Sequence, residues 1–526
     1  MSRPRPPLRL ATGVAALAVF IGLAAPSVPA MPSPSESRAA QAHVDPVLVQ
    51  RLQGGPTPGL LTYDDSQASR SEVAQHLAAS GTEARVFQGL SAALVCMGSM
   101  SDLHAAASAP GAVSVWGDRA LEPALDKSVP TAFNGDPRAV WNGQGYTGKG
   151  VGIAVLDTGV DGTHPDLQYG IKTKLNVRVL IGHRDILGPN ADPCVSDMYS
   201  DQVQDSETTS GHGTHIASVA AGDGTASGGL YTGVAPGADV MGVGINDTVT
   251  PKVEETNTQT YLSLFGVIGG INYILSCGIP PSFGDPKCPN GAILIKAVLA
   301  GWVQDGLYDP WHPLAWSIQE LYEFGITVVF PAGNEGPQAS DCSAAETCRI
   351  NANTASPYAV SVAATPKRSR TTLEGYSSRG DAQDREPRPG EVVQYRPTVA
   401  APGTGVVAAR RAGLAPFVQP PGSTLGAGPD GAVHVDRRYV GLTGTSVAAG
   451  HVAGAIALMQ QAAVEAKGCY LTAKQVKEVL QSTATPMPGY QPWEVGAGAV
   501  DITAAVQKAK AVPAVIFADD WMCPGL

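Results

Sequence analysis

The amino-acid sequence predicts an α/β protein, with a doubly wound, mainly parallel sheet preceded by a small α+β module. Two observations support this fold class. After residue 148, apolar runs rich in β-branched residues alternate with helical stretches, which is the order of a parallel sheet with crossover helices. Before residue 120, shorter strands and helices follow a different order. Of the 526 residues, 44% are hydrophobic and 15% are charged, which is enough apolar material for a large core.

The first residues of the chain are typical of a secretory signal peptide. Arginines open the chain, residues 10–25 carry no charge, and Val28-Pro29-Ala30 offers the small side chains of a cleavage site. An uncleaved membrane anchor is the alternative, and the apolar run is short for that role. We therefore expect a signal peptide over residues 1–30 and a secreted, extracellular protein.

Residues 31–125 are expected to hold a leader and a small folded module. Residues 31–60 are rich in Pro, Ser, Gly and Ala, which predicts a mobile leader. The patterns that follow have the order β-α-β-β-α-β, which is the ferredoxin-like arrangement. Ser71 and Ser101 are the expected helix caps, each followed by an acidic residue. The expected elements lie at residues 60–63, 71–79, 84–97, 101–108 and 112–116.

Residues 126–510 are expected to form the main domain, with a linker over residues 122–136 at its start and a tail over residues 511–526 after it. Polar loops follow several of the strands, and in open parallel sheets functional sites gather where the strands end. Expected strands lie at residues 151–159, 239–243, 292–299, 325–330 and 360–364, and expected helices at residues 215–221, 262–276, 315–324 and 446–465.

Composition excludes several classes of protein. The 35 basic and 46 acidic residues give a formal net charge of −11, whereas binding to nucleic acid requires clustered Lys and Arg. Glycine and proline number 61 and 42, but no Gly-X-Y period accompanies them, so the chain is not collagen. The acidic balance therefore argues against nucleic acid as a partner. No long apolar run follows the N-terminal region, so no membrane span is expected once the signal peptide is removed.

Eight cysteines are present, and export would permit disulfide bonds. None of them shows paired CxxC spacing, which argues against a zinc site. Sequence alone does not fix the connectivity. Short spacing predicts the pairs Cys277–Cys288 and Cys342–Cys348, with Cys469–Cys523 as a further candidate.

Three segments carry the residue types of acyl-transfer chemistry. Asp157 comes at the end of a buried apolar run, His212 lies between two glycines before a helical stretch, and Ser446 opens a long helix of small side chains. A serine hydroxyl becomes nucleophilic when a base takes its proton, and His can do so near neutral pH. A buried acid fixes the tautomer of that His and stabilises the imidazolium. These three residues are therefore candidate catalytic groups.

The chain order Asp, His, Ser differs from the order in chymotrypsin and in the α/β-hydrolases, and no Gly-x-Ser-x-Gly sequence surrounds Ser446. Together with Pro-Ala-Gly-Asn-Glu-Gly over residues 331–336, the three segments resemble the motifs of the subtilisin family of serine peptidases. The resemblance covers about residues 140–510 and includes residues 164–167, 233–238, 396–403 and 496–501.

This resemblance implies a role for each candidate. Asp157 would be the orienting acid, His212 the general base and then acid, and Ser446 the nucleophile. Asn334 and the backbone N–H of Ser446 would form the oxyanion hole. The module in front is similar to the family's intramolecular chaperone and inhibitor domain. The resemblance therefore implies a self-processing precursor, inhibited by its own propeptide, that hydrolyses proteins or peptides and needs no cofactor.

The sequence departs from the family pattern at the substrate-binding strand. Family members usually have Ser-Leu-Gly or Ser-Trp-Gly there, and this chain offers two registers, residues 298–300 or residues 301–303. Pairing with an extended substrate uses backbone groups, so it can survive this change. The candidate substrate-binding residues are Leu299, Gly301 and Gly333, and the preferred side chain of the substrate stays open.

Two further departures concern the neighbour of the nucleophile and a metal ligand. Val447 stands where many family members have Met. Asp166 matches a common calcium ligand of the family, but residues 222–229 do not resemble the loop that completes that site. No metal site is therefore expected.

Each motif also has a plainer interpretation. Asp157 could be a strand-end turn residue, His212 and His215 could bind a metal, and Ser446 could be an ordinary helix cap. Two other functions compete with a peptidase: an inactive subtilisin-like protein that holds a partner, and a hydrolase of non-peptide esters. The three motifs with Asn334 favour the peptidase over the first, and the inhibitor-like module favours it over the second.

Overall fold

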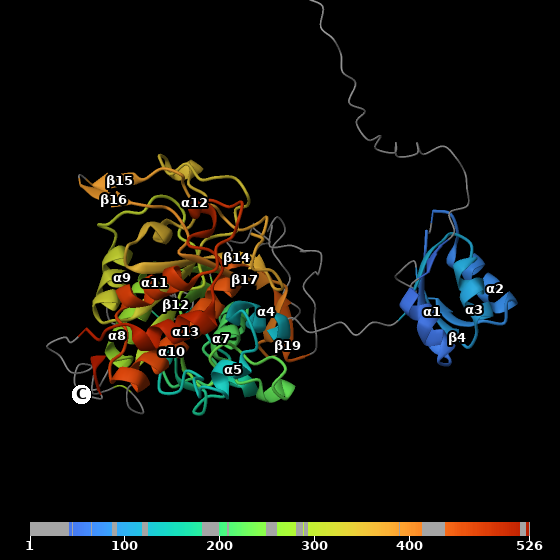
Figure 1. The fold of residues 1–526 in the computed structure, drawn as a ribbon, viewed down its shortest axis with the longest axis horizontal. Coiled ribbons are helices and arrows are strands. Elements are labelled where there is room, and N and C mark those ends of the chain that lie inside the picture. The colour runs from blue at the N-terminus through green and yellow to red at the C-terminus, as the bar shows by residue number, and fades with distance from the viewer. Residues whose placement is uncertain are drawn as a thin grey trace, which may run out of the picture. The chain divides into compact units, whose positions relative to one another are not determined.

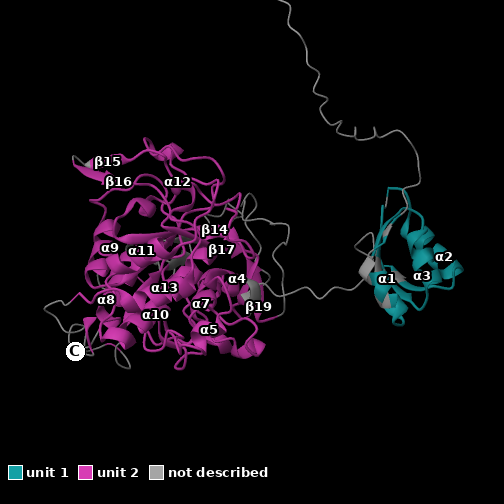
Figure 2. Ribbon diagram, in the orientation of Figure 1, with its two compact units in different colours: residues 1–121 teal, residues 122–526 magenta. Residues whose placement is uncertain are grey.

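A computed structural model of the chain describes residues 42–44, 46–64, 66–86, 92–117, 125–180, 199–207, 210–248, 260–262, 264–279, 288, 293–388, 390–412, 437–515 and 522–524. The predicted signal peptide, residues 1–30, lies outside this part of the chain. The chain divides into two compact units, Met1–Leu121 and Glu122–Leu526 (Figure 2).

The first unit contains a five-stranded sheet in the order β1-β5-β2-β4-β3 (Figure 1). From β2 onward its elements follow the order β-α-β-β-α-β expected from the sequence. The bounds are β1 His43–Val44, α1 Pro46–Gln53, β2 Thr57–Tyr63, α2 Arg70–Ala79, β3 Glu83–Val86, β4 Ala92–Met97, α3 Met100–Ala107 and β5 Ala112–Gly117.

The prediction of a mobile leader over residues 31–60 is wrong for the part that the structure describes. Strand β1 pairs in parallel with β5, and helix α1 follows it. Leu48 and Leu52 lie four residues apart on α1 and therefore share one face. Both side chains are buried in the core of the first unit. The composition of residues 31–60 gave no indication of this short apolar helix face.

The helix caps of the first unit lie two residues earlier than expected. Ser69, not Ser71, caps α2, because Glu72 at the third helical position completes a capping box with Ser69. In the same way Ser99, not Ser101, caps α3, and its hydroxyl accepts a hydrogen bond from the backbone N–H of Asp102 at 3.4 Å. The acidic residue marks the third position of each helix rather than the first.

The second unit is built on an eight-stranded sheet in the order β17-β14-β13-β12-β6-β9-β7-β8. All neighbouring strands are parallel except β7 and β8, so the predicted mainly parallel α/β sheet is confirmed. Its strands are β6 Gly152–Asp157, β7 Thr173–Val179, β8 Tyr199–Ser200, β9 Asp239–Gly244, β12 Ile295–Leu299, β13 Thr327–Pro331, β14 Ala359–Pro366 and β17 Val399–Thr404.

Helices pack against both faces of this sheet. Helices α7 and α10 lie on one face, and α8 and α9 lie on the other. The described helices of the unit are α4 Leu125–Phe133, α5 Arg138–Trp141, α7 His212–Ala221, α8 Leu264–Cys277, α9 Pro313–Glu323, α10 Thr445–Lys467, α11 Ala473–Thr483, α12 Pro492–Val495 and α13 Ile502–Ala511. The described residues of the unit also form three two-stranded antiparallel sheets: β10 Asn246–Thr248 with β11 Thr260–Leu262, β15 Arg385–Arg388 with β16 Glu391–Val393, and β18 Val406–Ala409 with β19 Tyr439–Leu442.

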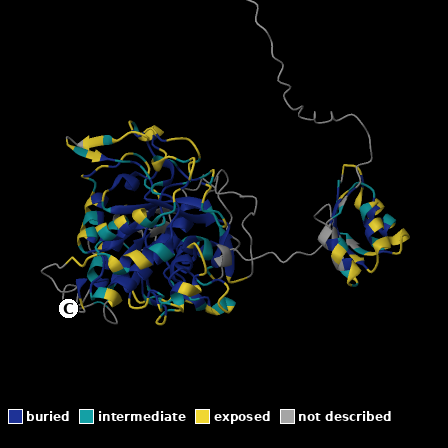
Figure 3. Ribbon diagram, in the orientation of Figure 1, coloured by how far each residue is buried: buried dark blue, intermediate teal, exposed yellow. Residues whose placement is uncertain are grey.

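The pleat of the central strands divides their side chains between two cores. On β6, Ile153 and Val155 belong to the core beneath α7 and α10, whereas Ala154 and Leu156 belong to the core beneath α8 and α9. Successive side chains of a strand point to opposite faces. Because both faces are covered, the strand is apolar throughout rather than alternating, and burial is concentrated in the sheet (Figure 3).

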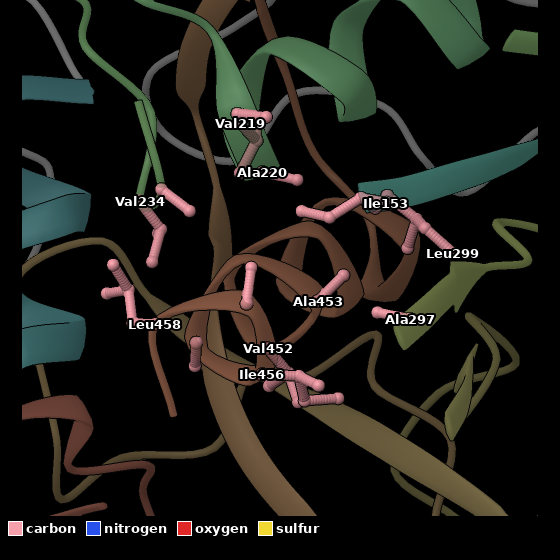
Figure 4. Close-up of a cluster of buried hydrophobic side chains, with 14 of the residues drawn as sticks. Ile153, Val219, Ala220, Val234, Ala297, Leu299, Val452, Ala453, Ile456 and Leu458 are labelled. Carbon is pink, nitrogen blue, oxygen red and sulfur yellow. The ribbon is translucent and has the colours of Figure 1, made fainter. Parts of the chain in front are cut away.

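Helix α10 lies at the centre of the larger core. Its residues from Thr445 to Ala463 are all buried, and Figure 4 shows Val452, Ala453 and Ile456 of this helix among side chains of α7, β6 and β12. The helix is long and apolar enough to span a membrane, but 94% of its most apolar window is buried inside the protein. It is therefore the core helix of a folded domain.

Two predictions about the edges of the main domain need correction or addition. The expected linker over residues 122–136 contains helix α4, because Val129, Ala132 and Phe133 are buried in the larger core. In the expected tail, Met522 and Cys523 are also buried.

The three predicted disulfides are confirmed: Cys277–Cys288, Cys342–Cys348 and Cys469–Cys523.

Close packing of α10 predicts that Gly454→Ala destabilises the protein. A Cβ atom there would lie 2.6 Å from the carbonyl oxygen of Ala220 and 2.6 Å from Cβ of Val234. Ala in place of Gly stabilises an unhindered helix by about 1 kcal/mol, but overpacking should here lower the free energy of unfolding by about 1–3 kcal/mol. Urea unfolding in a Ser446→Ala background measures the change.

Gly135→Ala is the matched control for this prediction. Gly135 has no positive φ, and a Cβ there would meet no atom within 4 Å. This substitution should raise the free energy of unfolding by up to about 1 kcal/mol. A Gly454→Ala protein as stable as the Gly135→Ala protein would contradict the close approach of α10 to α7.

Candidate active site

The fold brings Asp157, His212 and Ser446 together from three distant segments. Asp157 is the last residue of β6, His212 is the first of α7, and Ser446 is the second of α10. Nδ1 of His212 lies 2.8 Å from Oδ1 of Asp157, and Nε2 lies 2.8 Å from Oγ of Ser446. A carboxylate can only accept, so Nδ1 carries the proton and Nε2 accepts from the serine hydroxyl.

The environment of His212 favours its charged form. Burial lowers the pKa of its imidazole, but the charge of Asp157, the hydrogen bond to Asp157 and the charge of Glu207 together hold the pKa above its ordinary value. The Asp157 side chain is only 3% exposed, whereas that of His212 is 25% exposed. The ring can therefore face both a buried acid and a molecule arriving from solvent.

Ser446 is not the cap of helix α10, so that plainer interpretation does not hold. Gly444 occupies the N-cap position with extended backbone and offers no side chain. Ser446 lies in the first turn, where backbone N–H groups have no partner inside the helix. Its own N–H and the positive end of the helix dipole are therefore available to a negatively charged oxygen.

Asn334 lies beside the start of α10. Its Oδ1 accepts hydrogen bonds from the backbone N–H and the hydroxyl of Thr445, at 3.0 Å and 3.1 Å. Because the oxygen is held by the residue before Ser446, the amide NH₂ is the donor end of this side chain. Gly333 donates its N–H to the Thr445 hydroxyl at 3.1 Å and has φ +114°. A side chain at Gly333 would be strained and would crowd Ser378.

Of the candidates on the substrate-binding strand, only Gly301 lies at the site. A Cβ atom at Gly301 would lie 2.6 Å from Oδ2 of Asp157 and 3.0 Å from Cε1 of His212. Leu299, by contrast, is fully buried and pairs with β13 on one side and β6 on the other. It has no free strand edge for a substrate, so its assignment as a substrate-binding residue is not supported. Of the two registers, the one that begins at Gly301 lies beside the candidate catalytic groups.

The second histidine of the motif, His215, does not form a metal site with His212. Both ring nitrogens of His212 are already bonded, and Nε2 of His215 donates to the carbonyl oxygens of Val406 and Val440 at 3.0 Å and 3.1 Å. Burial lowers the pKa of His215 to about 3, so it stays neutral. Among the described residues, no group of three His, Cys, Asp or Glu side chains is placed to hold a metal ion.

Asp166 is held by protein donors. This fully buried carboxylate accepts hydrogen bonds from the backbone N–H of Ala226 and the hydroxyl of Tyr439, both at 2.7 Å. Ala226 belongs to the loop over residues 222–229, whose sequence differs from the family's calcium loop. The loop thus supplies a backbone donor to the carboxylate.

Sequence reasoning missed one acidic residue near the site. Glu207 is fully buried, and its Oε2 accepts a hydrogen bond of 2.6 Å from the hydroxyl of Thr158, the residue after Asp157. A glutamate in a polar segment such as Asp-Ser-Glu-Thr-Thr-Ser is usually solvent-exposed. No pattern in the sequence therefore distinguished it from a surface charge.

Comparison with known proteins agrees with this geometry. The family model described as "Subtilase family" matches residues 148–508, a stretch that contains Asp157, His212, Asn334 and Ser446. This chain belongs to the subtilase family. The prediction of a subtilisin-like serine peptidase, a hydrolase, is thereby confirmed at the level of the family.

Individual proteases match most of the chain at modest identity. Serine protease AprX of Bacillus subtilis (strain 168) is 27% identical over 387 residues, which cover 74% of this chain and 72% of AprX. Subtilisin E of the same organism is 27% identical over 381 residues, or 72% of each chain. An extracellular protease of Xanthomonas campestris pv. campestris is 27% identical over 378 residues, or 69% of this chain and 52% of that protein.

The side chain after Ser446 predicts resistance to oxidation. Val447 is buried and has no sulfur, and Met241 and Met459 are fully buried. Mild peroxide should therefore leave most peptidase activity intact. In a Val447→Met protein, a sulfoxide formed beside the candidate oxyanion donors should lower activity by at least about tenfold. Residual activity after peroxide treatment of both proteins is the measurement, and an equal, rapid loss in the two would show that another residue controls sensitivity.

Proposed function

We propose that this subtilase is a secreted serine endopeptidase that uses Asp157, His212 and Ser446 as its catalytic triad. The observation that carries the proposal is the continuous hydrogen-bond chain from Oγ of Ser446 through both nitrogens of His212 to Oδ1 of Asp157. Each distance is 2.8 Å, which suits proton transfer along the chain. An inactive protein that only holds a partner would have no need of this geometry.

In the acylation step, Nε2 of His212 takes the hydroxyl proton as Oγ of Ser446 attacks the carbonyl carbon of the substrate. The imidazole becomes imidazolium, and the buried carboxylate of Asp157 stabilises this charge. The carbonyl oxygen becomes an oxyanion, which would bind the side-chain NH₂ of Asn334 and the N–H of Ser446. His212 then gives its proton to the leaving amine, and an acyl-enzyme remains.

Deacylation repeats the same steps with water as the nucleophile. His212 takes a proton from water, hydroxide attacks the acyl carbon, and the oxyanion forms again at the same donors. When the intermediate collapses, His212 returns the proton to Oγ of Ser446. The same three side chains thus serve both halves of the reaction. Both rates therefore depend on the distances between these side chains and on their orientation.

The substrate is proposed to be an extended protein or peptide. Gly301 and Gly333 flank the candidate catalytic groups, and neither has a side chain that would block a neighbouring backbone. Pairing through the backbone of residues 301–303 would hold the substrate without demanding a particular side chain. Leu299 takes no direct part in this proposal, since it lies inside the sheet.

Secretion and self-processing complete the proposal. The basic and apolar start of the chain, the three disulfides and the extracellular proteases among the relatives all support export. Residues 31–125, with the small sheet of the first unit, are proposed to act as an intramolecular inhibitor that the enzyme removes. Mass spectrometry of the secreted protein should find a new N-terminus near residues 120–136.

Ser446→Ala is expected to abolish peptidase activity. Loss of a triad residue costs about 10⁶ in turnover in subtilisin, and a loss of that order is expected here because, among the described residues, Ser446 is the hydroxyl that bonds the imidazole ring of His212. The measurement is hydrolysis of an unstructured protein substrate. The variant should also accumulate as the uncut chain of residues 31–526. Near-normal hydrolysis would overturn the assignment of Ser446.

Asn334→Ala is expected to slow turnover while leaving the Michaelis constant nearly unchanged. Its NH₂ group is proposed to bind charge that exists only in the transition state. Removing an oxyanion-hole donor costs about 10²–10³ in turnover in subtilisin. Steady-state kinetics on a peptide substrate separate the two constants. A raised Michaelis constant with unchanged turnover would assign Asn334 to binding of the ground state instead.

A further inference from the structure

Glu207 is a buried acid that the proposed triad mechanism does not use. It lies five residues before His212 in the sequence and is 0% exposed. The backbone that carries it packs tightly against the end of β6. A Cβ atom at Gly159 would fall 2.2 Å from the carbonyl oxygen of Ser206 and 2.5 Å from the backbone nitrogen of Glu207. The segment therefore has little freedom to move away from the site.

Hydrogen bonds connect Glu207 to both neighbours of the Asp157–His212 pair. The hydroxyl of Thr158 donates to Oε2 of Glu207 at 2.6 Å and accepts from the backbone N–H of Gly213 at 2.8 Å. The backbone N–H of Thr158 donates to Oδ1 of Asp157 at 2.7 Å. Because Glu207 takes the only hydroxyl proton, the lone pairs of Thr158 are left to accept from the residue after His212.

A second hydroxyl, that of Thr214, approaches the same carboxylate oxygen at 3.4 Å. The Thr214 hydroxyl accepts a hydrogen bond from the backbone N–H of Asp161 at 3.0 Å. Its own proton points away from that donor and is directed to Glu207. Thr214 is fully buried in the first turn of α7. Glu207 therefore receives hydroxyl donors from the end of β6 and from the start of α7, the two elements that carry Asp157 and His212.

The other charged groups in the neighbourhood have different partners. Asp205 pairs with Arg411 at 3.2 Å and accepts the backbone N–H of Glu207 at 2.9 Å. Asp161 accepts from Thr163 and from the backbone of Ala412. Among the described residues, the titratable groups that shift the pKa of His212 are Asp157 from β6 and Glu207 from the segment before α7. His215 from α7 is itself buried, and its pKa is lowered to about 3.

We propose that Glu207 is a positioning residue of the active site, a second carboxylate that orients Thr158 and adds negative charge behind the Asp157–His212 pair. The proposal rests on the proposed triad mechanism and deepens it. The negative charge of Glu207 raises the pKa of His212, after the larger contribution of Asp157. The same charge stabilises the imidazolium that forms when His212 takes the serine proton.

The sign of the pH effect follows from this charge. Activity requires neutral His212, so the acid limb of the kcat/KM profile reports the pKa of His212 in the free enzyme. Removing a negative charge makes the imidazolium less favourable and lowers that pKa. The acid limb should therefore move to lower pH, while kcat on the plateau should fall because the imidazolium of the transition state is less stable. A purely structural defect would lower activity without moving the limb.

Glu207→Gln tests the charge, since Gln has nearly the same shape and can still accept from Thr158. The acid limb of the mature enzyme should move down by roughly 0.3–1 pH unit, and plateau kcat should fall about three- to tenfold with little change in KM. Glu207→Asp should keep the acid limb near its wild-type position. Asp205→Asn, which removes a nearby charge that faces Arg411, should leave both limb and kcat in place. An active Glu207→Gln enzyme with an unmoved acid limb would overturn the electrostatic role.

Thr158→Val tests the hydrogen-bond chain and serves if the Glu207→Gln chain fails to fold. It keeps the charge of Glu207 and removes the hydroxyl, so kcat should fall several-fold while the acid limb stays within roughly 0.2 pH unit of wild type. Wild-type kcat in Thr158→Val would overturn the positioning role. A wild-type protein without peptidase activity would instead contradict the triad mechanism, so the two failures are distinguishable.

Discussion

The burial of helix α10 is the constraint on which the rest of the main domain depends. This helix packs against α7 and against the strands β12, β13, β14 and β17, and its buried residues are rich in Gly, Ala and Val, whose small side chains allow close approach. At Gly450 and Gly454 the helix approaches the backbone of α7 so closely that a methyl group would crowd it. The separation of Ser446 from His212 is set by this contact, since each residue lies in the first turn of one of the two helices. The packing of α10 against α7 in the core thus fixes the distance between Ser446 and His212.

Burial also determines which groups near the site carry charge. His215 and His451 lie in the core, and burial lowers their pKa to about 3 and about 4, so they remain neutral at physiological pH. The pKa of His212 is instead raised, because the buried carboxylates of Asp157 and Glu207 stabilise its charged form. Moving a charge out of water is costly unless it is paired and hydrogen-bonded, and Asp157 and Glu207 each accept hydrogen bonds from backbone or hydroxyl donors. The site holds negative charge in place and lets one imidazole gain and lose a proton.

The front unit and the main domain differ in how clearly their sequences predict them. Apolar β-branched runs gave the central strands of the main domain to within a few residues, because a strand covered on both faces is apolar throughout. Helix α1 was missed because it is short: among its described side chains Leu48 and Leu52 are buried and Val49 is partly buried, within a segment rich in polar and small residues. The caps at Ser69 and Ser99 were misplaced because the acidic residue was read as the first helical position instead of the third. In both cases the local signal was present, but composition or a neighbouring serine outweighed it.

The sequence by itself indicated the family and determined the order of the candidate catalytic residues, because each depends on short local motifs. Short spacing also predicted two of the disulfide pairs, Cys277–Cys288 and Cys342–Cys348. Only the tertiary structure decided which residues meet. It placed Gly301 against Asp157 and His212 and put Leu299 inside the sheet, a choice between two registers that one strand cannot make without its neighbours. It also brought Glu207 behind the site, where burial and two hydroxyl donors distinguish it from a surface charge. Pairing across a sheet and desolvation are properties of the folded chain, and no local sequence pattern records them.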